Sequence, residues 1–510
     1  MPRRPMHVTD AAQDPLGAAL RGLRWRLEIP EHFPPTAQAE ADSAALAPRI
    51  PTATGDVATA DSLADATDLP LFTLERPGAP DLDRAMFLTR RPAGRGFRLH
   101  YAVADVASFV TPGGALDAEA HHRVATLDLP DERIPLHPYA LSERAAGLLP
   151  DQDRPAVLWQ LDLDADGDLT TASVRRARVR SRARLDHPAV QRILDDGTAE
   201  EPLALLRETG LLREARERAR GGISLYVPEA RLTVHDGHYA LTHRAPLPAE
   251  RFTAQLAQLV GVAAADLMLA AGTGILRTLP TAPDGSVARL RRTARALGVD
   301  WPHHTSYAAL IRGLDPHRAT HAAFLQECAT VLRGGDYLAF DGRPPPPSAA
   351  MHAAVALPYA HATAPLRRLV DRYTSELCLA ASAGIAPPPW VRSVLPGLPA
   401  TMATGARRAD EAERECVALV AAALLRDRIG ETFDAVVTET GDGAGAGART
   451  GTDATGPDAA AGVTVHLRAP AVAGHLTVPP GTPAPHPGDA LRVRVAAAEP
   501  GSDPVRFTPA

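Results

Sequence analysis

The order of segment types along the chain constrains its fold more than any other feature. Residues 71–110 alternate between apolar and polar positions and carry β-branched or aromatic side chains, which is typical of strands. A hairpin is predicted next, over residues 157–163 and 174–185. From Ala249 the apolar spacing becomes helical, over 252–276, 321–333, 363–381 and 405–428. Strands first and helices later predict an α+β fold.

The two ends of the chain differ from this central part. Residues 11–27 have helical spacing and are followed by prolines, so we expect an N-terminal helical segment over 1–35. Residues 36–66, rich in Ala, Asp and Thr, are expected to be a linker with some helix. The main domain then covers 67–428. Short alternating strands predict a small barrel over 429–510, with a flexible Gly/Ala-rich loop at 441–462.

Composition excludes several classes of protein. Only three cysteines occur, Cys328, Cys378 and Cys416, and they are far apart and show no paired spacing. This pattern argues against a disulfide scaffold or a zinc site and favours a reducing, cytoplasmic location. No run of about 20 uninterrupted apolar residues occurs, so we expect no membrane span and no signal peptide. The net charge of −6 leaves room for nucleic-acid binding only through a focused basic channel.

An acidic cluster carries the first chemical signal. Glu75, Asp81 and Asp83 lie within nine residues of one another, around a turn rich in proline and glycine. Carboxylates crowded in this way repel one another unless a hard cation lies between them, and Mg²⁺ takes such oxygen ligands together with phosphate oxygens. On spacing alone, a solvated acidic turn is an equally good interpretation.

Further motifs follow the cluster in a fixed order. Among them are Leu129-Pro-Asp-Glu-Arg-Ile-Pro-Leu-His-Pro138 and, far downstream, Tyr359-Ala-His-Ala-Thr-Ala-Pro-Leu-Arg-Arg-Leu-Val-Asp371. Over about residues 70–425 the chain resembles the catalytic RNB domain of the ribonuclease II / ribonuclease R family. The resemblance implies an RNB-type domain followed by a degenerate OB-like or S1-like barrel, and a hydrolytic 3′-to-5′ exoribonuclease that degrades single-stranded RNA. It also implies a shortened bacterial member, because the residues before the catalytic domain are too few for paired cold-shock barrels.

The same resemblance assigns the acidic residues. The family uses four aspartates around Mg²⁺, and their counterparts here are Glu75, Asp81, Asp83 and Arg84. We therefore expect Glu75, Asp81 and Asp83 to be metal ligands, with Mn²⁺ as a possible alternative ion. Asp81 and Asp83 are expected to be catalytic, together with Arg367, which stabilises the cleaved phosphate. Arg84 replaces a metal ligand by a cation, and we expect its guanidinium to pair with Asp81 or Asp83.

Positions that hold RNA diverge more from the family. Asp128 and Leu225 stand where the family has aromatic residues that clamp bases. The resemblance implies RNA contacts by His187, by Tyr226 beside Leu225, by Arg368 and by Glu413. Arg184 is the last of four arginines that alternate from Arg178, and they are either a phosphate track or a solvated strand face. For Arg367 and Arg368 the alternative is a solvated helix face.

These departures leave a second function open. The chain could be an RNA-binding protein with an RNB fold and weak or absent catalysis. The predicted barrel adds little to either function, because its aromatic residues, Phe433 and Phe507, occupy expected core positions and single-strand binding by such barrels depends on exposed aromatics. We infer no protein partner from the sequence.

Overall fold

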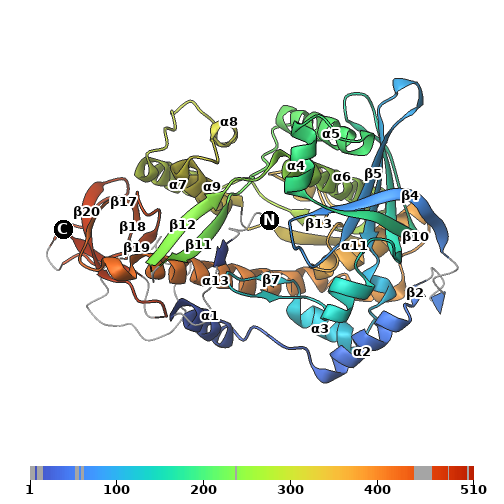
Figure 1. Ribbon diagram of the computed structural model, residues 1–510, viewed down its shortest axis with the longest axis horizontal. Helices are drawn as coiled ribbons and strands as arrows, with labels where there is room; N and C mark the ends of the chain where they lie inside the picture. The colour runs from blue at the N-terminus through green and yellow to red at the C-terminus, as the bar shows by residue number, and fades with distance from the viewer. Residues whose placement is uncertain are drawn as a thin grey trace.

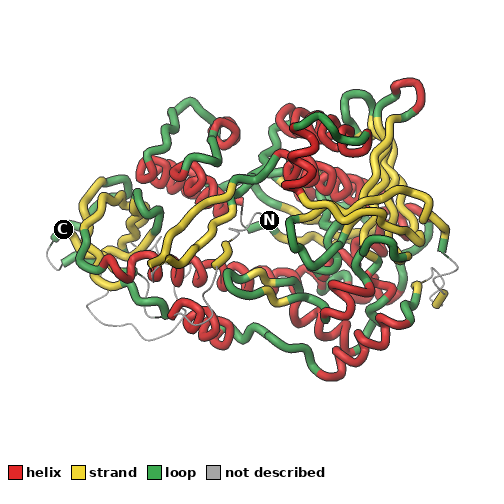
Figure 2. The backbone as a smooth tube through the Cα atoms, in the orientation of Figure 1, coloured by secondary structure: helices red, strands yellow, loops and turns green. Residues whose placement is uncertain are grey.

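The structure is a computed structural model of the 510-residue chain. It describes residues 6–8, 15–51, 57–58, 63–235, 238–332, 334–440, 462–479, 482–501 and 505–510. The described chain contains both helices and strands, as the α+β prediction requires. Figure 2 shows strands gathered at two opposite ends, with a two-stranded hairpin and helices between them.

A closed five-stranded barrel forms the end that holds the acidic cluster. Its strands are hydrogen-bonded in the order β10-β4-β5-β6-β9. They are β4 Ala64–Glu75, β5 Arg84–Arg90, β6 Phe97–Ala104, β9 Asp153–Leu163 and β10 Leu169–Asp186. The sequence indicated these strands but not their closure. Alternate side chains such as Leu74, Met86, Leu99, Tyr101 and Trp159 point inward and are buried, so the barrel has a packed core.

Helices cover this barrel (Figure 1). They are α4 His187–Asp195, α5 Glu201–Ala219, α6 Pro248–Ala271 and α11 Leu369–Ala383. Two further helices, α12 Pro389–Val394 and α13 Leu398–Leu425, follow α11 along the chain. By length and composition α6 passes the test for a membrane span, as the one such helix among the described residues. It is instead the core helix of this body, because it packs against α4, α5, α11 and β13 Thr273–Thr278 and most of its apolar residues are buried.

Residues 36–66, which were expected to be a linker with some helix, do contain a helix. The first part of this segment is helix α2, Pro35–Leu46, which packs on α3 Ala115–Arg123 and on the single helical turn η5 Ala140–Ala145. Ala37 and Ala41 are buried in that contact, because their small side chains allow α2 to lie close to its neighbours. The expected N-terminal helix is present as α1, Pro15–Arg26, and packs on α13. Two short strands, β2 Ile50–Pro51 and β3 Val57–Ala58, follow α2.

The remaining elements join this body to the C-terminal end. β1 Met6–Val8 pairs in parallel with β11 Glu229–His235, and β11 forms a hairpin with β12 His238–Arg244. β13 pairs with β14 Asp336–Asp341. Smaller elements in this part are α7 Asp284–Leu297, α8 Tyr307–Gly313, α9 Ala319–Cys328, α10 Pro347–Ala350, β15 Met351–His352 and β16 Leu357–Pro358. A short hairpin, β7 Leu127–Asp128 and β8 Arg133–Ile134, lies beside the acidic cluster.

A second closed barrel forms the C-terminal end, as expected. Its strand order is β17-β18-β19-β21-β20. The strands are β17 Thr432–Thr440, β18 Val463–Leu467, β19 Ala473–Leu476, β20 Ala490–Ala497 and β21 Arg506–Pro509. Phe433 and Phe507 are buried in its core, so neither can stack on a base from the surface. The predicted loop 441–462 lies outside the described residues apart from its last position.

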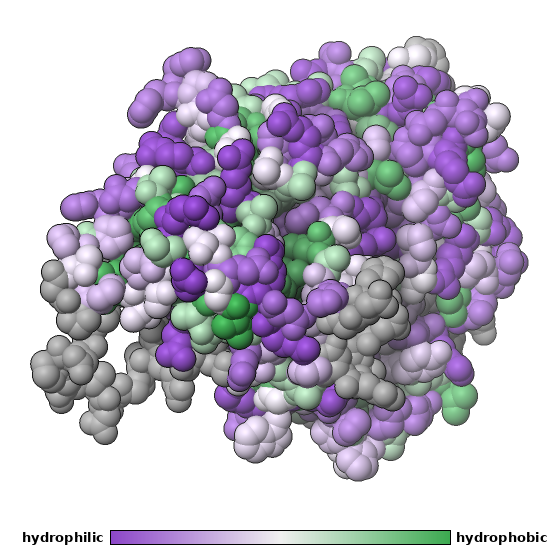
Figure 3. Space-filling model, turned by 60° about the vertical axis from the view of Figure 1, so that its left-hand side comes forward, coloured by the Kyte–Doolittle hydropathy of each residue, from purple (hydrophilic) through white to green (hydrophobic). Residues whose placement is uncertain are grey.

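The face shown in Figure 3 is largely hydrophilic, and its hydrophobic residues form small separate patches. Such a surface suits a polar ligand better than a broad apolar partner.

Candidate active site

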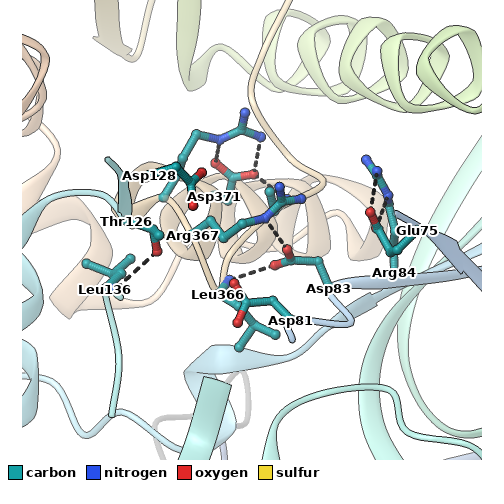
Figure 4. A network of polar contacts seen from close by, with 12 residues as sticks. Glu75, Asp81, Asp83, Arg84, Thr126, Asp128, Leu136, Leu366, Arg367 and Asp371 are labelled. Carbon is teal, nitrogen blue, oxygen red and sulfur yellow. Dashed lines mark hydrogen bonds and ion pairs between the residues drawn. The ribbon is translucent and has the colours of Figure 1, made fainter. Parts of the chain in front are cut away.

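The acidic loop, residues 76–83, connects β4 to β5 at one end of the first barrel. Glu75 ends β4, Asp81 and Asp83 lie in the loop, and Arg84 begins β5. Two other segments reach the same place: the hairpin of β7 and β8, and the turn that precedes α11 and carries Arg367 (Figure 4). The fold therefore brings together most of the residues that the sequence assigned to one site.

The side chain of Asp83 is fully buried, with none of its surface exposed. Its Oδ1 accepts a hydrogen bond of 2.8 Å from the backbone N–H of Leu366, and its Oδ2 accepts one of 2.6 Å from Nε of Arg367. A buried carboxylate is stable only when it is paired in this way. Asp83 thus fixes both the backbone and the guanidinium of the turn before α11.

Asp81 lies beside Asp83 and is held differently. Its Oδ2 pairs with the guanidinium of Arg133, which also lies 3.2 Å from Asp128. Its Oδ1 is buried and has no hydrogen-bond partner among the described residues. Burial raises the pKa of Asp81 to about 7, against the effect of Arg133 and with a further contribution from Asp83. The site therefore contains one buried carboxylate oxygen without a hydrogen-bond partner, which could coordinate a cation.

The ion pair between Arg133 and Asp81 is a contact that sequence reasoning missed. Arg133 belongs to Leu129-Pro-Asp-Glu-Arg-Ile-Pro, which was recognised only as a motif. A basic residue between two prolines that follows an acidic pair was the available signal. Its partner could not be inferred because Asp81 lies 52 positions earlier in the chain.

The predicted partner of Arg84 was wrong. Arg84 pairs with Glu75, at 2.9 Å from Nε to Oε1 and 3.4 Å from Nη2 to Oε2, and not with Asp81 or Asp83. Both residues belong to adjacent barrel strands and point to the same side, apart from the two aspartates (Figure 4). Burial lowers the pKa of Arg84, but Glu75, Tyr101 and Asp83 together raise it above its ordinary value, so the cation is retained.

Arg368 lies next to Arg367 and is oriented by Asp371. Its Nε and Nη2 donate to the two carboxylate oxygens of Asp371, at 2.9 and 2.8 Å. Asp371 also accepts a hydrogen bond of 2.7 Å from the backbone N–H of Ala364. Asp83 and Asp371 therefore hold the 364–368 turn from its two sides and present both arginines from it.

The other predicted RNA contacts are spread out. Arg184 is exposed on β10, and its Nη2 donates to the carbonyl of Ala79 in the acidic loop, at 2.7 Å. The four alternating arginines lie on one side of β10, but Arg178 and Arg180 already pair with Asp65 and Asp153. His187 is buried at the start of α4, and burial lowers the pKa of its imidazole. Base stacking by His187 is therefore blocked in this conformation.

Tyr226 and Glu413 lie in separate pockets. The hydroxyl of Tyr226 accepts a hydrogen bond of 3.2 Å from Gln255, and its ring faces a pocket lined by α5 and α8 residues such as Glu217 and Ile311. Glu413 lines a small pocket on α13, together with Thr126 and Asp128 of the segment beside the acidic loop. Glu413 is therefore near the cluster, whereas the structure does not bring Tyr226 to it.

Comparison with known proteins identifies this arrangement. The family model described as RNB domain matches residues 63–382. The chain belongs to the RNB family. A second model, the RNase II-type exonuclease C-terminal S1 domain, matches residues 431–510, which contain the second barrel. Exoribonucleases of the RNB family are hydrolases that degrade RNA and generally use divalent metal ions.

Curated relatives cover parts of the chain. The exosome complex exonuclease RRP44 homolog A of Arabidopsis thaliana is 30% identical over 338 residues, which make up 63% of this chain and 35% of that protein. Ribonuclease R of Escherichia coli is 34% identical over 176 residues, or 33% of this chain and 21% of the relative. The chain thus spans well under two thirds of the length of these relatives.

Solved structures share the fold. A Mycoplasma genitalium RNase R in complex with ribose methylated single-stranded RNA aligns with a TM-score of 0.74 and 18% identity, over 98% of this chain and 78% of that chain. Yeast Ssd1, described as a pseudonuclease, aligns with a TM-score of 0.57 and 16% identity, over 77% of this chain and 49% of that chain. An RNB fold accommodates both a chain that binds RNA and a chain called a pseudonuclease.

The residues present fit a metal ion only in part. Among the described residues, no three His, Cys, Asp or Glu side chains are grouped so that they could hold one. Glu75, Asp81 and Asp83 do not form one set of metal ligands as expected, because Glu75 forms an ion pair with Arg84. Asp81 and Asp83 do fit, since Oδ1 of Asp81 has no partner and Mg²⁺ is commonly held by one or two carboxylates plus water and phosphate.

Proposed function

We propose that this chain is a metal-dependent exoribonuclease that hydrolyses single-stranded RNA from its 3′ end and releases nucleoside monophosphates. The observation that carries the proposal is the buried oxygen of Asp81 without a partner, next to the pair of Asp83 and Arg367. Asp81 and Asp83 would hold the ion, with Mg²⁺ the first choice and Mn²⁺ the second. A bound ion would polarise the phosphate and activate water.

Arg367 is the residue that meets the phosphate in this proposal. Its side chain is 32% exposed and donates through Nε to Asp83. That geometry leaves the Nη groups to donate to phosphate oxygens, where they offset the charge that develops as the phosphodiester bond breaks. Asp83 keeps the guanidinium oriented, so little reorganisation is needed during reaction.

We also propose that the protein is cytoplasmic. All three cysteines, Cys328, Cys378 and Cys416, are free and buried, which supports a reducing cytoplasmic environment.

The direct test is incubation of purified protein with end-labelled single-stranded RNA in the presence of Mg²⁺, Mn²⁺ or EDTA. We expect stepwise shortening from the 3′ end with either metal and intact RNA in EDTA. Asp83→Asn should lower the rate by about 10²-fold or more, because it removes one ligand charge and loosens Arg367. Circular dichroism should show that the variant remains folded. An unchanged rate in that variant contradicts the site assignment.

A second candidate function is RNA binding without appreciable hydrolysis. The ion pair of Glu75 and Arg84 favours it, because a cation occupies the position of a fourth ligand and neutralises the first. The pseudonuclease Ssd1 shows the same general fold. The same incubation separates the candidates: binding to labelled RNA without shortening under any metal supports the second one.

A further inference from the structure

A cavity of about 480 Å³ lies beside the acidic loop, and we call it the loop cavity. Its volume falls within the range of about 300–1,000 Å³ that is typical of small-ligand sites. Residues 76–80 of the acidic loop and 128–133 of the β7–β8 hairpin line it, together with residues of β1, β11 and β12. Arg133 lines the cavity and also contacts Asp81. The loop cavity therefore adjoins the cluster that contains the candidate metal ligands.

The charged side chains that line the loop cavity form ion pairs, with one exception among the described residues. The pairs are Glu229 with Arg231 and Arg244, Glu250 with Arg244, Asp128 with Arg133, and Asp131 and Glu132 with Arg24. The exception is Arg76, which lines the cavity and is exposed. None of the described carboxylates forms an ion pair with it. The loop cavity thus has one cation left for an anionic ligand.

The backbone that carries Arg76 is restrained from two sides. The N–H of Ala79 donates to the carbonyl of Arg76, at 3.0 Å, and closes a tight turn through Pro77 and Gly78. The positive φ of Gly78, 71°, matches the third position of a type II turn, and proline is common at the second. Arg184 on β10 donates to the carbonyl of Ala79, at 2.7 Å. Arg76 is therefore presented from a fixed point of the acidic loop.

Arg76 also borders the small pocket on α13 that contains Glu413. The lining residues common to this pocket and the loop cavity are His7, Arg76, Asp128, Leu129 and Pro130. Strand β1, which carries His7, is held there by its pairing with β11 and by a hydrogen bond of 2.9 Å from the N–H of Val8 to the carbonyl of Pro130. Arg76 thus lies where the two cavities adjoin, next to the acidic loop.

The charge balance of the loop cavity favours a phosphodiester over a more highly charged anion. A phosphodiester carries one negative charge, and a guanidinium can donate two parallel hydrogen bonds to its oxygens. An anion with several charges would meet one free cation and, at the same time, the carboxylates of Asp128, Glu229 and Glu250. A single strand of RNA presents one such charge per nucleotide, and its sugars and bases can bond to the paired polar side chains.

We propose that the loop cavity is a subsite for the RNA strand, in which Arg76 binds a backbone phosphate near the 3′ end. This inference rests on the proposed function for its ligand. The phosphate that Arg76 holds is not the reacting one, which Arg367 meets in the proposed mechanism. Arg76 is therefore a binding residue that sets where the strand lies when its end reaches Asp81 and Asp83.

RNA binding without turnover tests this role. Single-stranded RNA oligonucleotides, each with one neutral methylphosphonate linkage near the 3′ end, are bound in EDTA, and gels confirm that the RNA stays intact. In the unaltered protein, the linkage that meets Arg76 should weaken binding about fivefold when it is neutral. Arg76→Gln should lower the affinity for unmodified RNA by a similar factor, and this one position should then lose its effect. Arg76→Lys should retain part of the affinity because it keeps the charge.

The matched control is Arg207→Gln on α5. Arg207 is also exposed and forms no ion pair with a described carboxylate. Its neighbour Glu208 pairs with Arg90, at the end of β5 opposite to Arg84 and the acidic loop. The control removes the same charge away from the loop cavity, so RNA affinity should change by less than about twofold. Both variants should keep their melting midpoints within about 2 °C, since both residues are exposed.

The outcomes separate this inference from the proposed function. The inference is overturned if the methylphosphonate effects at every position are the same in the unaltered protein and in Arg76→Gln. Equal losses of affinity in Arg76→Gln and Arg207→Gln also overturn it, because the effect is then one of net charge alone. RNA that binds with the expected position effect but is never shortened supports the inference and contradicts the nuclease proposal. Failure of the unaltered protein to bind any RNA overturns both.

Discussion

At the scale of residues, the site is a set of matched charges. Glu75 pairs with Arg84, Asp81 with Arg133 and Asp83 with Arg367. Each arginine comes from a different position in the fold, and each restrains its carboxylate in a different direction. The result is a cluster that is nearly neutral at rest and still offers one buried oxygen of Asp81. Metal affinity should therefore depend on the arginines as much as on the acids.

Arg84 gives the sharpest test at this scale. Arg84→Asp frees Glu75 and adds a carboxylate, and each of these changes of one charge is worth roughly tenfold in cation affinity at about 10 Å. We expect hydrolysis to begin at lower Mg²⁺ in Arg84→Asp than in the unaltered protein, with Arg84→Gln in between. Rates across a Mg²⁺ titration check this order. If Arg84→Asp is no faster at any concentration, Arg84 does not suppress metal binding.

The sequence predicted the members of this cluster better than their pairing. Asp83 and Arg367 were expected to act in one site, and they are in contact although 284 positions separate them. The partner of Arg84 was wrong because the choice among Glu75, Asp81 and Asp83 depends on strand pairing in the barrel. Alternation along a strand gives the side on which a residue lies, but not the residue that faces it from the next strand.

At the scale of elements, two barrels differ in what they offer to RNA. In the first barrel, β10 presents two exposed arginines: Arg182, which donates to the carbonyl of Thr67 on β4, and Arg184, which donates to that of Ala79 in the acidic loop. In the second barrel, Phe433 and Phe507 are buried. Basic side chains near the acidic loop should therefore contribute more to RNA affinity than the second barrel does.

A pair of matched substitutions tests that difference. Arg184 on β10 and Arg494 on β20 are both exposed and both donate to a backbone carbonyl, of Ala79 and Gly430. Arg184→Gln should weaken RNA binding about fivefold and lower the slope of log affinity against log salt by about 0.7. Arg494→Gln should change neither by a measurable amount. Equal losses in the two variants would show that the second barrel contacts RNA.

Two elements were beyond sequence reasoning for physical reasons. Residues 36–66 have few large apolar side chains, so the sequence predicted a linker with some helix, but not that α2 packs through Ala37 and Ala41 on a surface made by α3. β1 has three residues and becomes a strand only because β11 offers it an edge. In both cases the structure depends on a tertiary partner, and the local sequence pattern does not identify that partner.

At the scale of the whole molecule, buried titratable groups link stability to pH. His137 lies between β8 and η5 and is almost fully buried. Burial and, to a smaller degree, Arg372 lower its pKa to about 4, although the carbonyl of Pro365 favours the charged form. His361 is also buried, and burial, with a smaller effect of Arg368, lowers its pKa well below the ordinary value. Both imidazoles are therefore neutral in the folded protein.

This neutrality predicts a loss of stability in mild acid. The unfolded chain takes up a proton on His137 near pH 6.5, whereas the folded protein does so only near pH 4. The stabilising effect is thus fully present above pH 6.5 and is lost as the pH falls toward 4. At pH 5, His137 alone should reduce the free energy of unfolding by about 2 kcal/mol.

Denaturant unfolding at pH 7.5 and pH 5, with His137→Gln beside the unaltered protein, measures this difference. The variant should lose about 2 kcal/mol less between the two pH values. An equal loss in both proteins would mean that His137 titrates normally in the folded state.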